Sequence, residues 1–416
     1  MFSLLYCVAL LGTTVLASTG ETKTCTVAHL PGRQDDGASI RAAFKECSHD
    51  AKIVLDQYYS VDSLLVTTGL RNVEVELSGT LQYTPDIAKW SPDSLFLVYQ
   101  NTTTFWFLSG TNVHIYGGGT IDGNGQVWYD ALASNHDTGT AGSSTTSFAR
   151  PVPLTIGNSS NVLVEDLNQI NSPNWVLTHL LIFYQSAQYC SLSINASSYS
   201  SNPAANSDGW DIYRSSFVTI TDSVINNDDD CVSFKPNSTN IVVSNLWCNG
   251  SHGISVGSLG QYAGETDIVA NVSVRNITMM HAQNGARIKV FGGNPSPTST
   301  SGGGTGFVKN ITFEDFFGSK VDIDSSDVRQ CYETDATTCA EFPSKLTISD
   351  VHFINVKGTS SGAEGAVVVD IECSEECEDI TAVGTDLNSP SGSAEFVCMN
   401  VASTAELDFN CTTPSD

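Results

Sequence analysis

Short runs of alternating apolar and polar residues follow one another along most of the chain. A β-branched run opens on Asn-Val or a near equivalent at residues 72–77, 112–116, 161–166, 217–222, 240–245, 271–276, 308–313 and 346–351. Alternation with a period of two predicts β-strands that present one face to a core. Helical periodicity is nearly absent, and the one fair helix is expected between Asp35 and Cys47, where Ile40, Ala43 and Phe44 fall on one face.

The recurrence of these strands predicts a solenoid. Each unit is too small to bury its apolar face alone, so stacked copies are needed to make a continuous core. The spacing between the runs varies, which fits coils joined by loops of different length. We therefore predict an all-β fold, a single right-handed parallel β-helix, with the helix at 35–47 as its N-terminal cap.

An antiparallel sandwich or propeller is the main alternative architecture. It would favour two-residue Asn-Gly hairpins and an even strand spacing. The Asn-Gly dipeptides at Asn124, Asn249 and Asn284 do not recur between successive runs, so the parallel coil is preferred.

The first 17 residues, MFSLLYCVALLGTTVLA, form an apolar stretch that ends in small residues before Ser18. This is the shape of a secretory signal, although no Lys or Arg precedes the apolar run. Acceptor sequences for N-glycosylation at Asn101, 158, 195, 237, 249, 271, 276, 310 and 410 agree with passage through a secretory pathway. We predict a signal peptide over residues 1–17, a β-helix catalytic domain over 18–416 and a secreted, extracellular protein.

Twelve cysteines are present, of which Cys7 falls in the predicted signal. Proximity along the chain suggests the pairs 25–47, 231–248, 331–339, 373–377 and 398–411, although connectivity cannot be deduced from sequence alone. Cys190 is then the odd cysteine and is expected to be a buried thiol. A zinc site at Cys373 and Cys377 would need a second pair or spaced histidines, which do not follow.

The chain of 416 residues carries 45 acidic and 18 basic side chains, for a net charge of −27. Such an acidic protein repels polyanions, which argues against nucleic acid or an anionic membrane as partner. With 40% hydrophobic residues, the chain is too apolar to be disordered. Because the ends of a solenoid are usually capped, a monomer is expected.

The densest group of chemically useful residues lies between Asn206 and Lys289. It contains NSDG at 206–209, NNDDDC at 226–231, SHG at 251–253 and RIK at 287–289. Residues one or two coils apart can lie side by side on one face of a solenoid, and alternation on a strand points Arg287 and Lys289 the same way. The sequence therefore predicts clustered carboxylates with a cationic pair beside them.

This combination suits hydrolysis of a glycosidic bond in an acidic sugar polymer. The reaction needs one protonated carboxyl to donate to the leaving oxygen and one carboxylate to activate water or attack carbon. Crowded aspartates raise the pKa of at least one of them. An arginine and a lysine would hold an anionic sugar through charge-assisted hydrogen bonds, so we expect a polymer of uronic acids as the partner.

Each motif taken alone has a simpler interpretation. Residues 226–230 could form a solvated turn or a calcium-binding loop. Arg287 and Lys289 could be the wet face of an edge strand, and His252 could be an ordinary loop residue. The conjunction of four such motifs in order favours the catalytic hypothesis.

In that order the four motifs resemble the signature motifs of the polygalacturonases, glycoside hydrolase family 28. The resemblance extends over nearly the whole mature chain, and the surrounding residues look most like the fungal exopolygalacturonases. It implies a right-handed parallel β-helix and an inverting hydrolase that needs no cofactor and no metal. The implied substrate is polygalacturonate (pectin), cut at α-1,4-galacturonosidic bonds.

The resemblance also implies a role for each site residue. Asp229 would be the general acid, and Asp208 and Asp230 together would activate water. His252 would form a hydrogen bond within the site and help keep the acid protonated. Arg287 and Lys289 would bind the galacturonate carboxylate.

Tyr332, in the sequence QCY, resembles a family tyrosine that contacts the sugar. Three positions depart from the usual pattern: Ser207 stands for Thr, Asp228 for Gln or Gly, and Ser251 for Gly. Of these, Asp228 adds a negative charge beside the acid and so bears on the pH dependence.

Exo action, with release of galacturonic acid from the non-reducing end, would require one end of the binding face to be closed. The Gly/Ser/Thr-rich stretches 134–147 and 294–306 are the candidate walls. The alternatives are an endo-polygalacturonase, a rhamnogalacturonan or xylogalacturonan hydrolase, a pectate lyase and a polysaccharide-binding β-helix without activity.

Overall fold

Parallel strands make up most of this computed structural model, which describes residues 22–134, 148–180, 186–293, 301–322 and 324–413. One ladder of parallel strands runs the length of the molecule: β1 (Lys23–Thr26), β2 (His49–Leu55), β4 (Leu65–Leu77), β8 (Trp106–Tyr116), β12 (Ser160–Glu165), β15 (Ala187–Cys190), β18 (Ser216–Asn226), β20 (Ser238–Asn249), β22 (Thr266–Met280), β24 (Thr305–Val321) and β26 (Lys345–Ser360). A second ladder starts beside β8 and comprises β11 (Leu154–Gly157), β14 (Leu177–Leu180), β17 (Trp210–Tyr213), β19 (Asp230–Phe234), β21 (Gly253–Leu259), β23 (Ala286–Phe291), β25 (Ser326–Tyr332), β27 (Val367–Val383) and β29 (Glu395–Val401).

Shorter strands and helices complete the coils. The short strands are β3 (Tyr58–Val61), β5 (Thr80–Tyr83), β9 (Thr120–Asp122), β13 (Asn168–Ile170), β16 (Ser193–Asn195) and β28 (Asp386–Asn388). A separate small sheet holds β6 (Leu95–Phe96), β7 (Thr103–Thr104) and β10 (Pro151–Val152). The helices are α1 (Gly37–Glu46), α2 (Ile87–Asp93), α3 (Gln126–Ser134), α4 (Ala336–Glu341) and the 3₁₀ turn η1 (Tyr99–Asn101).

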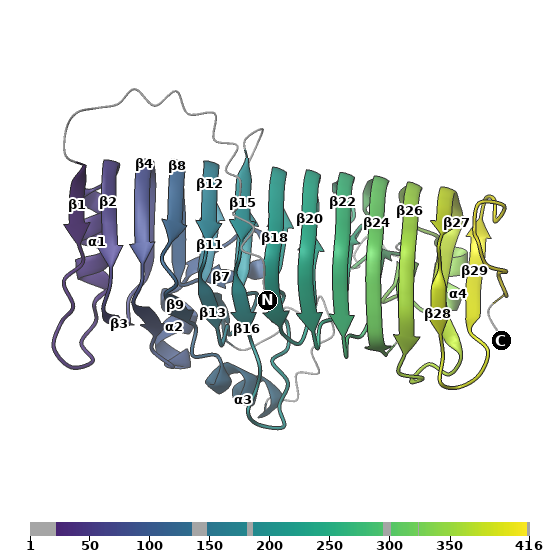
Figure 1. Cartoon of the computed structure of the whole chain (residues 1–416), viewed down its shortest axis with the longest axis horizontal. Coiled ribbons are helices and arrows are strands. Elements are labelled where there is room, and N and C mark those ends of the chain that lie inside the picture. Colours follow the sequence, from purple (N-terminus) through teal and green to yellow (C-terminus); the bar gives the residue numbers. More distant parts are fainter. Residues whose placement is uncertain (1–21, 135–147, 181–185, 294–300, 323, 414–416) are drawn as a thin grey trace, which may run out of the picture.

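The strands stack side by side from β1 at one end to β29 at the other, so the molecule is long and narrow (Figure 1). Each strand of a ladder pairs in parallel with the strand one coil later, and among the described strands only β6 and β7 pair antiparallel. The fold is a right-handed parallel β-helix, as the sequence predicts, and the antiparallel alternative is excluded.

The residues that open the repeated runs lie at bends in the backbone. Asn72, Asn112, Asn161, Asn240 and Asn271 all have φ between 50° and 57°, a left-handed conformation that asparagine tolerates better than most residues. At these bends the side-chain amides of neighbouring coils form hydrogen bonds with each other. Asn112 Nδ2 donates to Asn72 Oδ1 at 2.8 Å, and Asn161 Nδ2 donates to Asn112 Oδ1 at 3.0 Å. The recurring Asn therefore turns the chain and also links one coil to the next.

The core is a column of apolar side chains inside the coils. One row passes through Val75, Ile115, Val164, Tyr189, Ile220, Val243, Val274, Phe313 and Phe353, which are register partners in successive strands. All are buried, and the Phe313 and Phe353 rings stack with centroids 5.6 Å apart. Each unit thus buries its apolar face only against its neighbours, as expected of a solenoid.

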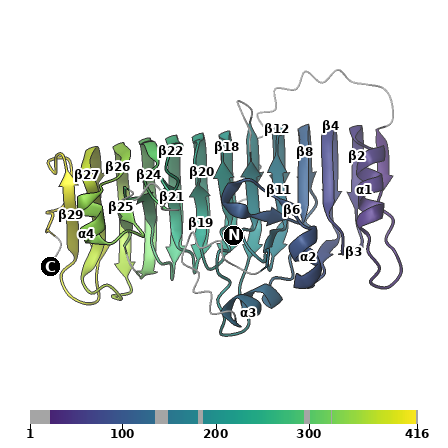
Figure 2. The same cartoon turned by 180° about the vertical axis from the view of Figure 1, so that it is seen from behind.

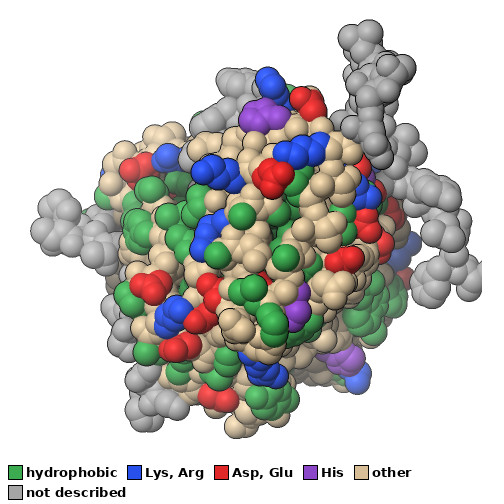
Figure 3. Space-filling view, turned by 90° about the vertical axis from the view of Figure 1, so that its left-hand side faces the viewer, with side chains coloured by type: hydrophobic (Ala, Val, Ile, Leu, Met, Phe, Trp, Pro, Cys, Tyr) green, Lys and Arg blue, Asp and Glu red, His purple; other side chains and the backbone are tan. Residues whose placement is uncertain are grey.

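Helix α1 closes the end of the solenoid at β1 (Figure 2). Ile40 and Phe44 are buried in the main core, and the Phe44 ring meets Trp106 edge to face at 5.6 Å. On the outside of this end, basic and acidic side chains are interspersed among apolar ones (Figure 3). The predicted capping helix is therefore present, shorter by a residue or two at each end.

The five cysteine pairs suggested by proximity are all disulfides: 25–47, 231–248, 331–339, 373–377 and 398–411. This number of disulfides is typical of proteins from oxidising compartments. The expectation of a buried thiol at Cys190 is wrong, because this cysteine is also disulfide-bonded.

The predicted signal peptide lies outside the described residues, as do most of the stretches 134–147 and 294–306. In the part of the chain that is described, the helices are all too short or too polar to pass through a bilayer.

Candidate active site

The motif residues gather on the outward face of the second ladder, which we call the site face. Along β17, β19, β21, β23, β25 and β27, the register partners on this face are Asp211, Ser233, Ser255, Arg287, Asp327 and Asp370. The residues that follow each of these in sequence point into the core, for example Ile212, Phe234 and Val256. Alternation along parallel strands therefore builds one polar row from six coils.

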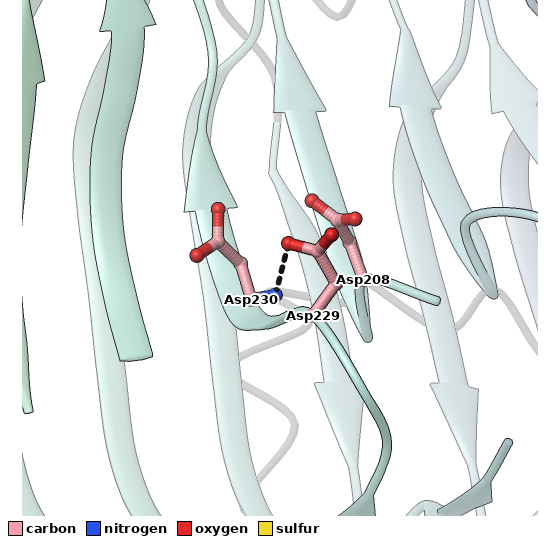
Figure 4. Close-up of side chains that lie close together, drawn as sticks. All are labelled: Asp208, Asp229 and Asp230. Carbon is pink, nitrogen blue, oxygen red and sulfur yellow. Dashed lines mark hydrogen bonds between the residues drawn. The ribbon is translucent and has the colours of Figure 1, made fainter. Parts of the chain in front are cut away.

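Asp208, Asp229 and Asp230 come together at the point where β17 and β19 begin. One carboxylate oxygen from each lies within 4.8 Å of those of the other two, and Figure 4 shows all three side chains directed to the same space. Asp229 turns back to accept a 2.7 Å hydrogen bond from the backbone N–H of Asp230. Two adjacent coils thus place three carboxyl groups in one small volume.

Asp230 is held in its ionised form. Its Oδ2 lies 2.7 Å from Lys289 Nζ, and its Oδ1 accepts a 2.6 Å hydrogen bond from Ser255. Burial alone would raise the pKa of Asp230, but the charges of Lys289, Lys235 and Arg287 together outweigh burial and lower this pKa below its usual range. A carboxylate that keeps its charge in a buried place is suited to accept a proton from water.

Asp229 pairs with His252, whose Nδ1 lies 3.2 Å from Asp229 Oδ1. Burial opposes the charge on both groups, yet the pair overcomes it: the pKa of Asp229 is lowered by His252, and the pKa of His252 is raised by Asp229. In the substrate-free site the shared proton therefore resides on His252. The role of His252 in keeping Asp229 protonated during the reaction stays a prediction.

The pKa of Asp208 is shifted in the opposite direction to those of Asp229 and Asp230. Burial, together with the charges of Asp211 and Asp229, raises the pKa of Asp208 well above its ordinary value. Burial likewise raises the pKa of Asp211 to about 7, although Lys235 opposes this shift. The site thus contains both protonated and ionised carboxyl groups near neutral pH.

Lys235 lies between these two protonatable carboxyls. Its Nζ is 3.0 Å from Asp211 Oδ1 and 3.4 Å from Asp208 Oδ2, and it is 5.3 Å from the centre of the Trp175 ring. Burial disfavours the ammonium, but Asp211 and Asp208 raise the pKa of Lys235 well above its usual range. This buried cation offsets part of the negative charge of the cluster.

Arg287 and Lys289 project together from β23, as alternation predicts. Arg287 Nε lies 3.0 Å from Asp327 Oδ2. The Tyr332 ring covers both cations, with Arg287 Cζ at 5.6 Å and Lys289 Nζ at 5.7 Å from its centre. The pair therefore has a fixed orientation beside the aspartates.

Asp228 lies at the edge of the cluster. Burial raises its pKa, and the nearby charge of Asp229 adds to this effect while His252 opposes it. Asp228 therefore remains protonated to a higher pH than an ordinary aspartate. At acidic pH it adds less negative charge beside Asp229 than the sequence suggests.

Lys235, Ser255, Asp327 and Asp211 contact the predicted site residues but are not among the site residues predicted from the sequence. Lys235 directly follows β19, which ends at Phe234, and it comes two residues after Ser233, the spacing of one face of a strand. That alternation is the signal that could have identified it. Ser255 and Asp327 give no comparable signal, because their importance arises only from the register of distant coils.

A buried group of ionised and protonated carboxyls, with a cationic pair beside it on a parallel β-helix, defines a glycoside hydrolase. Residues 52–407 match the family described as glycosyl hydrolases family 28, and the chain belongs to this family.

Relatives in fungi are similar over most of their length. The chain is 45% identical over 399 residues to a probable exopolygalacturonase X of Aspergillus fumigatus, covering 94% of this chain and 89% of the relative. It is 43% identical over 402 residues to an exopolygalacturonase of Cochliobolus carbonum, covering 95% and 87%. Among solved structures, the endo-xylogalacturonan hydrolase from Aspergillus tubingensis superposes with a TM-score of 0.80 at 31% identity, covering 94% of this chain and 99% of that one.

Proposed function

We propose that this enzyme is an exo-acting polygalacturonase that hydrolyses α-1,4-galacturonosidic bonds of homogalacturonan from the non-reducing end and releases galacturonic acid. The observation that carries the proposal is the meeting of Asp208, Asp229 and Asp230 beside Arg287 and Lys289 on one face. Fungal relatives at 43–45% identity that are named exopolygalacturonases support the substrate class and the exo mode.

In the proposed reaction Asp229 donates a proton to the leaving glycosidic oxygen. His252, which holds the shared proton in the free site and lies 3.2 Å from Asp229, supplies it when the substrate displaces water. Asp230 takes a proton from the attacking water, whose oxygen bonds to the anomeric carbon. Lys289 lowers the pKa of Asp230, whereas burial raises that of Asp208, so we assign the proton transfer from water to Asp230, with Asp208 beside it.

The family resemblance implies inversion at the anomeric carbon. In inverting enzymes generally the two carboxyls are about 6.5–9.5 Å apart, whereas the nearest oxygens here are within 4.8 Å. Inversion therefore rests on family membership and not on this separation. Proton NMR of the first product formed from an oligogalacturonate tests it, and we expect the β-anomer.

Arg287 and Lys289 would bind the carboxylate of a galacturonate, with Tyr332 against the sugar ring. A neutral sugar would gain nothing from two buried cations, whereas a uronate forms charge-assisted hydrogen bonds with both. This argues against a rhamnose-centred site. The three aspartates could by distance hold a cation, but Lys235 and Lys289 already neutralise them, so we expect neither metal nor cofactor in the reaction.

Release of reducing ends from polygalacturonate by the wild type and by Asp229→Asn tests the proposal. We expect the wild type to release galacturonic acid as the main product, unaffected by a chelator, and Asp229→Asn to lose about 10²–10⁴-fold in kcat while still binding substrate. Asp386→Asn, at an exposed position on β28, is the matched control. Unsaturated products that disappear with a chelator would instead identify a lyase, and retained binding without any wild-type turnover would identify a binding protein.

Xylogalacturonan hydrolysis is the second candidate, favoured by the TM-score of 0.80 to an endo-xylogalacturonan hydrolase. Parallel assays on xylogalacturonan and on unsubstituted polygalacturonate separate the two. A higher kcat/KM on the xylose-bearing polymer would favour this second function.

We also propose that residues 1–17 are removed as a signal peptide, that residues 18–416 form one catalytic domain, and that the protein is secreted as a glycosylated monomer. Five disulfides support an oxidising destination. N-terminal sequencing of the secreted protein should begin at Ser18, and light scattering should give the mass of one chain plus glycan.

A further inference from the structure

A short hairpin crosses the site face on the N-terminal side of the aspartates. It is formed by β6 and β7, which pair antiparallel through Leu95 with Thr104 and Phe96 with Thr103. β7 continues the small sheet by pairing in parallel with β10, through Thr103 with Pro151. Figure 2 shows β6 in front of β11, not in the solenoid itself.

The tip of this hairpin, residues 97–102, is packed down onto the site face. Leu97 and Tyr99 are buried in a small apolar cluster with Val152, Trp175 and Tyr213, separate from the main core. The Tyr99 ring stacks on Tyr213 with centroids 4.1 Å apart and lies 6.1 Å from Trp175. The tip is therefore a packed part of the fold and not a loop projecting into solvent.

Two polar side chains on the site face, next to the coil that carries Tyr213, are inaccessible. Thr155 on β11 and Thr178 on β14 are register partners in the row that continues to Asp211. Each alternates with residues of the main core, so each points outward, yet they are only 0% and 2% exposed. The site face is thus covered in the two coils that precede Asp211.

The far side of the tip is attached beyond the active site. Gln100 Nε2 donates a 3.1 Å hydrogen bond to Gln261 Oε1, a residue 161 positions later that follows β21. Gln261 is itself 5% exposed, and its carbonyl accepts a 2.6 Å hydrogen bond from the Gly302 N–H. The hairpin therefore reaches from the coil of β8 to the coil of β21.

The distance from the tip to the reacting groups is short. Trp175, which contacts Tyr99, lies 5.3 Å from Lys235 Nζ, and Lys235 Nζ lies 3.4 Å from Asp208. A sugar chain extending along the face past Asp208 toward β14 and β11 would collide with Tyr99 and Leu97. On the other side of the aspartates lie the cationic side chains of β23, which can bind the continuing polymer.

We propose that the hairpin at residues 95–104, with Tyr99 and the Gln100–Gln261 hydrogen bond, is the wall that restricts this enzyme to chain ends. The inference rests on the proposed function and names the segment that determines its exo mode. In this arrangement the terminal uronate lies between the tip and Asp229, and the rest of the chain continues over Arg287 and Lys289.

The first test replaces residues 97–102 by Asn-Gly. This turn suits the two-residue connection of an antiparallel pair, and Phe96 and Thr103 are already such a pair. On polygalacturonate we expect the variant to release dimers and trimers, and to lower viscosity several-fold more per bond broken than the wild type. Asn101→Gln, which removes the glycosylation sequence but keeps the tip, and Val98→Ser, at an 83% exposed position, are the controls and should release monomer.

The double variant Tyr99→Ala/Gln100→Ala gives a second measurement with the hairpin length unchanged. It should show the same shift in products to a smaller degree. If circular dichroism shows that the variant with the shortened hairpin does not fold, this double variant provides the test. Exclusive release of monomer by a folded variant of either kind would contradict the proposed role of the hairpin as a wall. Absence of galacturonate release from the wild type would overturn the proposed function instead, so the two failures are distinguishable.

Discussion

Lys289 Nζ lies 2.7 Å from Asp230 Oδ2, although the two residues are 59 positions apart in the sequence. The same ammonium is 5.7 Å from the centre of the Tyr332 ring. One side chain thus sets the charge of the proposed base and lines the place where the substrate carboxylate would bind. Loss of this cation should therefore change catalysis as well as binding.

Lys289→Met should move the acid limb of the kcat–pH profile to higher pH. Burial favours neutral Asp230 and Lys289 is the main group that opposes it, so removing the ammonium raises the pKa of the base and inactivates it at low pH. We expect kcat to fall at least about 10²-fold at acidic pH. Lys309→Met, on an exposed part of β24, is the control. An unchanged acid limb would contradict the role of Asp230 as base.

His252→Gln should move the alkaline limb of the same profile to lower pH. In the wild type the pair with Asp229 keeps its proton up to the raised pKa of His252. In the variant only a carboxyl can hold this proton, and a carboxyl loses it at lower pH. Measurement of kcat across the pH range tests this expectation, with circular dichroism to verify that the variant folds. If the alkaline limb of the variant matched that of the wild type, His252 would not take part in the proton transfer.

Lys235→Met should destabilise the protein and abolish most activity. Asp211 and Asp208 would lose their buried cation, and removing one partner of a buried ion pair costs about 3–5 kcal/mol. Protonation of both aspartates relieves this cost, so the loss in Tm should be smaller at pH 4 than at pH 8. Equal losses at both pH values would show that Lys235 acts through packing alone.

The disulfide between Cys231 and Cys248 directly follows Asp230 and connects β19 to β20. Replacing both cysteines by alanine should cost about 2–4 kcal/mol and reduce kcat, because the start of β19 positions Asp230. The pair 373–377, far from the aspartates along the chain and closing a shorter loop, is the matched control. Its double-alanine variant should lower Tm less and leave kcat at the wild-type value.

Thermal stability should decrease as the pH rises from about 4 to 8. Burial and the charge of Asp327 raise the pKa of Asp324 to about 8, and burial and Glu372 raise that of Asp370 to about 7. These carboxyls are protonated in the folded protein at pH values where they ionise in the unfolded chain. The folded state therefore binds more protons, and stability falls with pH in this window.

Calorimetry at intervals of pH measures this decrease, with about 2–4 °C of Tm for each kcal/mol. Asp324→Asn should flatten part of the curve, because an amide does not titrate. A Tm that rises between pH 4 and 8 would contradict the assignment.

The coil architecture could be predicted from the sequence because its determinants are local. Asn72 and Asn112 begin β-branched runs and occupy the left-handed turns that asparagine accepts, and Ile40 and Phe44 give the capping helix its apolar face. These features depend on residues a few positions apart. Stacking then needs only that each run resemble the next.

The rest of the site depends on register between distant coils. Lys235 meets Asp211 only because β17 and β19 pair with Asp211 opposite Ser233. The ionisation of Asp208 and Asp229 could not be predicted either, since burial and neighbouring charges decide it.

The stretches 134–147 and 294–306 stay candidate walls, since most of their residues lie outside the described part of the chain, but the hairpin that we propose as a wall has a different composition. A Gly/Ser/Thr-rich composition indicates loops, whereas the hairpin at 95–104 contains Tyr99 and Leu97, which pack onto Tyr213 more than 100 residues away.

The bonded asparagines on the outside of the coils have a consequence for how the protein ages. Asn112 donates to Asn72 and accepts from Asn161, so each amide uses both its nitrogen and its oxygen. Slow deamidation of Asn112 would leave a carboxylate with no hydrogen to donate, and the oxygen of Asn72 would lose its partner. Deamidation at such a bend should therefore loosen adjacent coils from the outside, while the aromatic and aliphatic interior remains intact.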